Sequence, residues 1–93
     1  MLYVTKIRML PGQLHSTRCE DIESMYLKGA HSETFHLKET VHAFLSAYPD
    51  TVMLESKDTL FRIEAATSPT GIHYVRSKNY QTETDPLFCL PKV

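Results

Sequence analysis

Four residues in the first half of the chain have a spacing close to that of a zinc finger. His15, Cys19, His31 and His36 give the pattern H-x3-C-x11-H-x4-H, and structural zinc is held by four nitrogen or sulfur ligands. Two features argue against this chemistry. A helix is predicted to begin near His36, which separates the two later histidines, and the stretch between Cys19 and His31 lacks the spaced Phe and Leu residues of a finger core. We therefore interpret the histidines as scattered surface residues and expect no metal and no other cofactor.

Nucleophilic catalysis has less support than metal binding. The chain contains no Gly-x-Ser-x-Gly motif, and its three glycines form no phosphate-binding loop. Cys19 lies beside Arg18 and four residues from His15, which would lower the pKa of its thiol, but it is followed by carboxylates that would raise that pKa: Glu20, Asp21 and Glu23. We expect a protein that is not an enzyme.

Basic and aromatic residues near the C-terminal part of the chain could bind single-stranded nucleic acid. Arginine and tyrosine side chains can hold phosphates and stack on bases, and the candidates here are Arg62, Tyr74, Arg76, Lys78 and Tyr80. In the alternative interpretation Tyr74 belongs to the core and Arg76 pairs with Asp85. The second interpretation is favoured because the chain, with a net charge of −1, supplies no general attraction for a polyanion.

One amphipathic helix is predicted over residues 36–48. Its apolar positions follow the helical period and are expected to form one buried stripe: Leu37, Val41, Phe44, Leu45 and Tyr48. Lys38 would lie on the polar side. Pro49 ends the helix because it disfavours helical geometry at the residue before it. Ser32 and Thr34 are the best candidates for capping its start.

The rest of the chain predicts short strands. Residues 3–9, 51–55, 60–66 and 72–76 are rich in β-branched and aromatic residues, residues 21–27 form a weaker candidate, and the polar residues 56–58 suit a hairpin. The apolar segment 86–91 is expected to lie across the core. The sequence therefore predicts a single α+β domain over residues 1–93, with a small, mostly antiparallel sheet of four or five strands and one amphipathic helix packed on one face.

The composition limits the location and class of the protein. The 93 residues are 42 % apolar, too rich for a disordered chain. No apolar run reaches the roughly 20 residues that span a bilayer, and the first residues do not form a secretory signal. Two cysteines, Cys19 and Cys89, fit reduced thiols in a cytoplasmic protein, with Cys89 packed as a small hydrophobic residue between Phe88 and Leu90.

Several short motifs resemble a known family. The chain opens with residues 4–9, Val-Thr-Lys-Ile-Arg-Met, followed by a turn that contains Gly12 and His15. It closes with Ile-His-Tyr-Val-Arg-Ser at 72–77, Thr-Asp-Pro-Leu at 84–87 and Leu-Pro at 90–91. This order resembles the small bacterial and phage proteins grouped as domain of unknown function 3892, although Pro86 stands where Asn is common and the region 15–32 is longer. The resemblance implies the fold and size, and a phage or mobile-element product that modulates a host system.

These observations favour a small binding module that acts through protein–protein interaction. Its partner would be another protein, or a second copy, added at an exposed strand edge. The residues expected to take part in binding are Arg62, Tyr74, Arg76, Asp85 and His15. A weak single-stranded nucleic-acid-binding domain that uses the basic and aromatic face is the alternative.

Overall fold

The computed structural model describes residues 1–29 and 31–93, without the side chain of Ser32. It contains six strands, one α-helix and two short 3₁₀ helices: β1 (Leu2–Met9), η1 (Cys19–Asp21), β2 (Ile22–Gly29), β3 (Ser32–Leu37), α1 (Lys38–Ala47), β4 (Val52–Ser56), β5 (Thr59–Thr67), β6 (His73–Ser77) and η2 (Pro86–Cys89). The strands form one sheet in the order β3-β2-β1-β4-β5-β6, in which only β1 and β4 are parallel among the described strands. The predicted α+β class is confirmed, but the sheet is mixed and has six strands.

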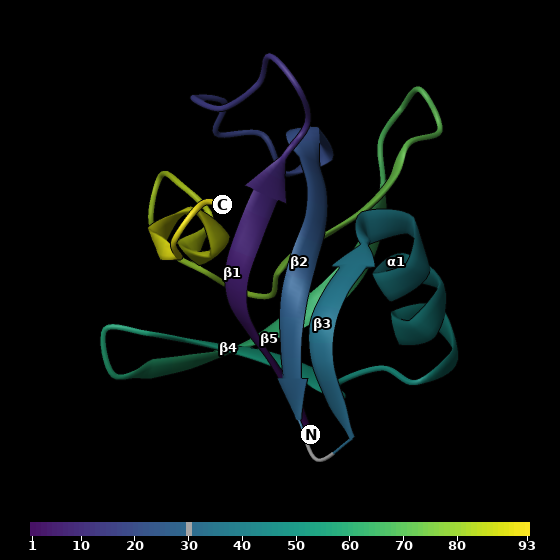
Figure 1. Cartoon of the computed structure of the whole chain (residues 1–93), viewed down its shortest axis with the longest axis vertical. Coiled ribbons are helices and arrows are strands. Elements are labelled where there is room, and N and C mark those ends of the chain that lie inside the picture. The colour runs from purple at the N-terminus through teal and green to yellow at the C-terminus, as the bar shows by residue number, and fades with distance from the viewer. Residues whose placement is uncertain (30) are drawn as a thin grey trace.

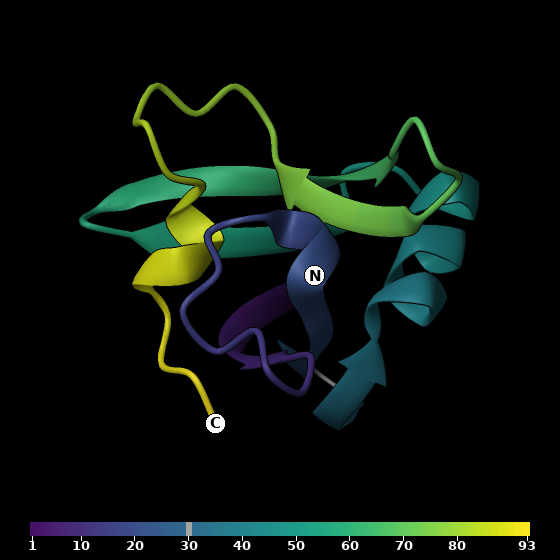
Figure 2. The same cartoon turned by 90° about the horizontal axis from the view of Figure 1, so that it is seen from above.

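The sheet consists of two antiparallel meanders, β1–β3 and β4–β6. They are joined by two residue pairs between β1 and β4, Leu2 with Val52 and Tyr3 with Met53. In Figures 1 and 2 the two meanders cross at a steep angle, with α1 at one end of the molecule and η2 at the other. The inward faces of the two meanders are apolar, and they pack together in a single core.

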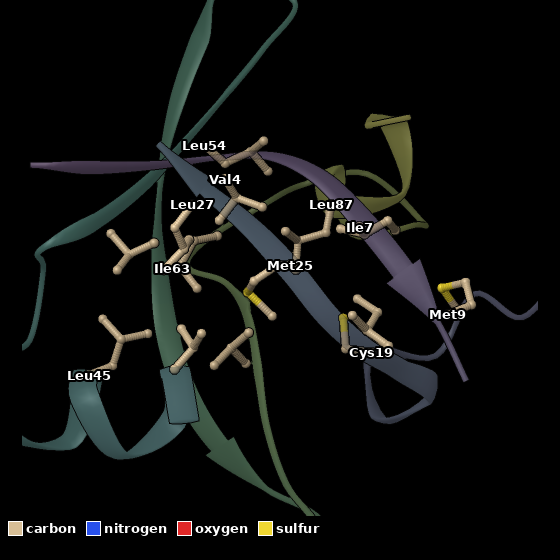
Figure 3. Close-up of a cluster of buried hydrophobic side chains, with 14 residues drawn as sticks. Val4, Ile7, Met9, Cys19, Met25, Leu27, Leu45, Leu54, Ile63 and Leu87 are labelled. Carbon is tan, nitrogen blue, oxygen red and sulfur yellow. The ribbon is translucent and has the colours of Figure 1, made fainter. Parts of the chain in front are cut away.

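The core draws on both meanders, as Figure 3 shows. The first contributes Val4, Ile7, Met25 and Leu27, the second Leu54 and Ile63, and Leu87 enters from η2; each of these side chains is at most 4 % exposed. The predicted position of the apolar C-terminal segment over the core is therefore confirmed.

Strand β3 replaces the predicted beginning of the helix. Its residues pair with β2 over six positions, from Gly29 with Ser32 to Ser24 with Leu37, so the proposed caps at Ser32 and Thr34 lie within a strand. Leu37 is the N-cap residue, and its side chain makes no capping hydrogen bond. Period alone could not separate this strand from the helix, because Phe35 and Leu37 suit both structures.

Helix α1 buries less of its apolar stripe than predicted. Val41 and Leu45 are buried, whereas Leu37, Phe44 and Tyr48 are 54 %, 38 % and 60 % exposed. Lys38, expected on the polar side, is buried, and its Nζ donates a hydrogen bond to the carbonyl oxygen of Glu20 at 2.8 Å. The long lysine stem packs at the helix start while its charged end reaches a backbone acceptor.

The turn between β4 and β5 explains how the chain reverses there. Lys57 and Asp58 have φ values of 49° and 64° and join the paired residues Ser56 and Thr59. Two successive residues with positive φ are the mark of a type I′ turn, which matches the twist of the flanking strands. The predicted hairpin at residues 56–58 is confirmed.

The C-terminal segment closes the free part of the β1 edge. Ile7 donates its N–H to the carbonyl oxygen of Pro91 at 3.0 Å and accepts from the N–H of Val93 at 3.0 Å. Both cysteines are free thiols, but Cys89 is exposed, contrary to the prediction, because η2 turns its Leu87 side inward instead. No helix in the described part of the chain is long and apolar enough to cross a membrane.

Candidate binding surface

The outer face of the first meander carries nine side chains in three rows of three. Two irregularities in the pairing of β1 with β2, after Val4 and after Arg8, interrupt the alternation of the strand, so that Tyr3 and Lys6 point to the same side. The register of the three strands gives the rows. We call this surface the β1–β3 face: Tyr3, Lys28 and Glu33; Lys6, Tyr26 and Phe35; Arg8, Ser24 and Leu37.

Cations stand over aromatic rings at the centre of this face. Lys6 Nζ lies 5.0 Å from the centroid of the Tyr26 ring, and the guanidinium carbon of Arg8 lies 4.1 Å from that of Phe35. The two rings meet edge to face at 5.2 Å. A cation over a ring face is attracted by the ring quadrupole, so these four side chains hold one another in place.

The charge of the β1–β3 face is mostly uncompensated. Lys28 and Glu33 lie 3.9 Å apart as an exposed ion pair. Lys6 and Arg8 have no carboxylate within 4 Å among the described residues. Three cations and one carboxylate therefore share a surface on a chain whose net charge is −1.

Two further features lie on or beside this face. A cavity of about 620 Å³ opens next to its first row, with Tyr3, Lys28, Glu55 and Leu90 in its walls. Ser24, in the last row, is buried, and its hydroxyl has no hydrogen-bond partner among the described residues. Buried hydroxyls are usually hydrogen-bonded, so the hydroxyl of Ser24 is still able to form a hydrogen bond.

The two ends of the sheet differ in how well they are covered. β3 and β6 are the edge strands. The end of β6 is fixed by Asp85, whose carboxylate accepts hydrogen bonds from the N–H and the hydroxyl of Ser77 at 2.8 and 2.7 Å; η1 and α1 also pack against β6. α1 also contacts β3, but β3 pairs with β2 alone, and its residues Glu33, Thr34 and Leu37 are exposed. Among the described strands, β3 is the open edge.

Of the sequence-predicted binding residues, the structure places Arg62, Tyr74 and Arg76 on the second meander, and the basic residues there are paired with carboxylates. Arg62 and Lys78 both lie near Asp50, at 3.8 and 3.9 Å. Arg76 donates from Nε to Glu64 at 2.7 Å, and not to Asp85 as the alternative interpretation had it. Each cation of this group thus has a carboxylate beside it.

Tyr74, Arg76 and Asp85 share a small pocket, whereas His15 is separate. The pocket has a volume of about 180 Å³ and also contains Cys19. His15 is exposed in the loop between β1 and η1. The structure therefore brings together three of the five predicted binding residues, around a pocket whose carboxylate is already used in the fold.

Cys19 in this pocket is a hydrogen-bond donor. Its Sγ donates to Oδ2 of Asp85 at 3.4 Å, and the thiol is buried. Burial, reinforced by the negative charge of Asp85, raises the pKa of the Cys19 thiol far above its ordinary value, because both disfavour a thiolate. A protonated thiol is a poor nucleophile, so this geometry does not favour covalent chemistry at Cys19.

The zinc-like pattern is not assembled as a metal site. Cys19 is buried, while His15 and His31 are exposed. In residues 1–29 and 31–93, no three His, Cys, Asp or Glu residues are grouped so that they could hold a metal ion.

Sequence reasoning found part of the β1–β3 face and missed its centre. Tyr3 and Tyr26 are of a residue type that interfaces favour, but no sequence pattern singles out Lys6, Arg8 and Phe35. Phe35 lay just before the predicted helix and in no predicted strand, so the sequence did not indicate that its ring would lie on the sheet, where Arg8 reaches it. No family model, curated protein or solved structure matches the chain, so the resemblance to domain of unknown function 3892 stays a prediction.

Proposed function

We propose that the protein is a non-enzymatic binding module that pairs an extended segment of a partner protein with β3. The main support for this proposal is the position of Lys6 and Arg8. These two cations have no carboxylate partner among the described residues, and they lie on the face next to the open edge of the sheet. An added strand obtains main-chain hydrogen bonds from the edge, and its alternate side chains obtain specificity from the neighbouring face.

The position of Arg8 indicates which side chains a partner segment would carry. Arg8 starts on β1 and reaches the ring of Phe35 on β3, a span of two strand spacings or about 10 Å. Its guanidinium therefore lies within reach of a side chain on a strand added beyond β3. A carboxylate is its natural ligand, and the exposed Leu37 in the same row offers an apolar contact. We expect a segment in which acidic and apolar residues alternate.

The test uses labelled extended peptides and fluorescence anisotropy. An acidic peptide with alternating Glu and Val should bind, and the same peptide with Lys in place of Glu should not. Arg8→Ala should weaken binding up to about fivefold, since an exposed ion pair contributes roughly 0.2–1 kcal/mol. Arg62→Ala is the matched control and should leave binding unchanged. Equal binding of the acidic and basic peptides would refute the proposal.

The second candidate function is single-stranded nucleic-acid binding, and one observation favours it. The β1–β3 face combines three aromatic rings with three cations, as in sheets that stack bases. This moves the alternative away from Arg62, Tyr74 and Arg76, where the cations are paired. Short single-stranded DNA should then bind with a strong salt dependence, lost in Arg8→Ala and kept in Arg76→Ala. Loss in Arg76→Ala instead would return the site to the second meander.

The setting of the protein follows from its thiols and from the family resemblance. Two free cysteines, one of them exposed, fit a reducing compartment, and we propose a cytoplasmic location. If the resemblance holds, the partner belongs to a bacterial host system that the protein modulates. Antibody staining or fractionation of the native host, followed by capture of the chain with its partner, tests both points.

A further inference from the structure

A second group of chemically capable side chains lies where α1 meets the end of the β5–β6 hairpin, away from the proposed partner edge. His42 comes from α1, and Thr67 and His73 are the cross-strand pair that begins the β5–β6 ladder. Figure 2 shows α1 beside the turn that joins these two strands. The imidazole rings of His42 and His73 have their centroids 4.4 Å apart.

The ring nitrogens of the two histidines converge on one oxygen atom. His42 Nε2 lies 3.4 Å and His73 Nδ1 lies 3.2 Å from Oγ1 of Thr67. Two ligands of one zinc ion, each about 2.1 Å from it, are separated by roughly 3.2–3.4 Å when they subtend a tetrahedral or slightly smaller angle. Each of the two nitrogens is therefore separated from Thr67 Oγ1 by the distance expected between two ligands of one metal ion.

We propose that His42 and His73 bind a divalent transition-metal ion of the zinc, nickel and copper group, with Thr67 Oγ1 beside it. Imidazole nitrogen is a preferred ligand of these ions. No third His, Cys, Asp or Glu joins the pair in the described part of the chain. The remaining ligands are water molecules, which makes this an open, exchangeable site and not a closed structural one.

The protonation of His42 is suited to this role. Partial burial, and secondarily the neighbouring His73, lower the pKa of His42 below its ordinary value, because both disfavour a charged imidazole. A metal ion must bind a nitrogen that carries no proton. Binding of one ion by both rings would link α1 to the β5–β6 hairpin.

Titration of the full chain with Zn²⁺ tests the proposal. All proteins carry Cys89→Ser, which removes the exposed thiol as a competing ligand. Isothermal titration calorimetry should show one equivalent of Zn²⁺. His42→Gln and His73→Gln should each lower the association constant at least about tenfold, while His15→Gln and His31→Gln, both at exposed positions, should not change it. Thr67→Val should have a smaller effect.

A second measurement keeps the test decisive if a histidine variant unfolds. Substoichiometric Cu²⁺ broadens the NMR signals of residues near it, and in the unsubstituted histidine background the signals of His42, Thr67 and His73 should disappear first. Earlier loss of the His15 or His31 signals would overturn the proposal. So would the absence of Zn²⁺ binding, or equal Zn²⁺ binding by the His42→Gln/His73→Gln double variant.

Discussion

Both meanders are three-stranded and antiparallel, but their basic side chains have different kinds of partner. On β4–β6, Arg62, Lys78 and Arg76 each lie beside a carboxylate. On β1–β3, Lys6 and Arg8 lie over aromatic rings instead. A ring orders a cation without neutralising it, so the first meander keeps a positive charge that a partner can use. Counting basic residues along the chain cannot distinguish these two situations, because what matters is the group placed opposite each cation.

The largest expected effect tests whether the meanders are one unit. Leu54 lies on β4, is fully buried, and packs in the core that both meanders share. Leu54→Ala should lower the free energy of unfolding by about 3–4 kcal/mol, from lost burial and the cavity left behind. Leu60→Ala, at an exposed position of the adjacent strand, is the control. Chemical denaturation measures the change in the free energy of unfolding. Hydrogen exchange of the folded protein should show that amide protection is lost equally in β1–β3 and β4–β6. Loss confined to β4–β6 would mean two independent units.

The next effect separates the two sheet edges. Asp85 accepts from Ser77 at the end of β6 and from the N–H of Leu87 at 2.9 Å. Asp85→Ala leaves these buried donors without an acceptor and should cost about 2–3 kcal/mol, with hydrogen exchange accelerated in β6 more than in β3. Glu83→Ala, at an exposed neighbouring position, should have almost no effect. A larger acceleration of exchange in β3 than in β6 on Asp85→Ala would contradict the assignment of edges.

A smaller effect measures the outer faces directly. A double-mutant cycle of Arg8→Ala with Phe35→Ala should give a coupling energy of about 0.5–1 kcal/mol. The corresponding cycle for Arg76 and Glu64, which are 50 % and 32 % exposed in their side chains, should give about 0.2–1 kcal/mol and fall as salt is added. If the Arg8 coupling were absent, the rings would not be holding the cation in place.

The smallest expected effect is a pH dependence where α1 meets the second meander. Because the pKa of His42 is lowered by burial and by His73, the unfolded chain binds more protons than the folded one as the pH falls through about 6.5. The contribution of His42 to stability is therefore complete above that pH and is lost below it. Urea denaturation between about pH 7.5 and 5 should show the loss, and His42→Gln should reduce it. An unchanged pH profile in that variant, with His15→Gln as the reference, would contradict the assigned cause.

The sequence was sufficient for the elements that are decided locally. The helix around Val41 and Leu45, the two-residue turn at Lys57 and Asp58, and the burial of Leu87 follow from period, turn chemistry and hydropathy. These features depend on residues within a few positions of one another, and the α+β class follows from them.

The candidate surface needed information that local patterns do not carry. An uninterrupted alternation would place Tyr3 and Lys6 on opposite sides of the sheet, and only the pairing irregularity in β1 brings them together. Phe35 fits a strand or a helix equally well, and the choice is made by its partner Tyr26 on β2. The partner carboxylates of Arg62 and Arg76 are likewise set by the tertiary structure, so the binding face could not be identified from residue types alone.

The hydrogen bonds between Ile7 and the segment 91–93 have a consequence for biosynthesis. A ribosome delivers β1 first, yet this strand obtains its last neighbour only after translation has passed Val93. During the interval the side of β1 around Ile7 is a bare template for other chains. Nascent protein therefore passes through a period of vulnerability to mispairing, which ends when residues 91–93 dock beside Ile7.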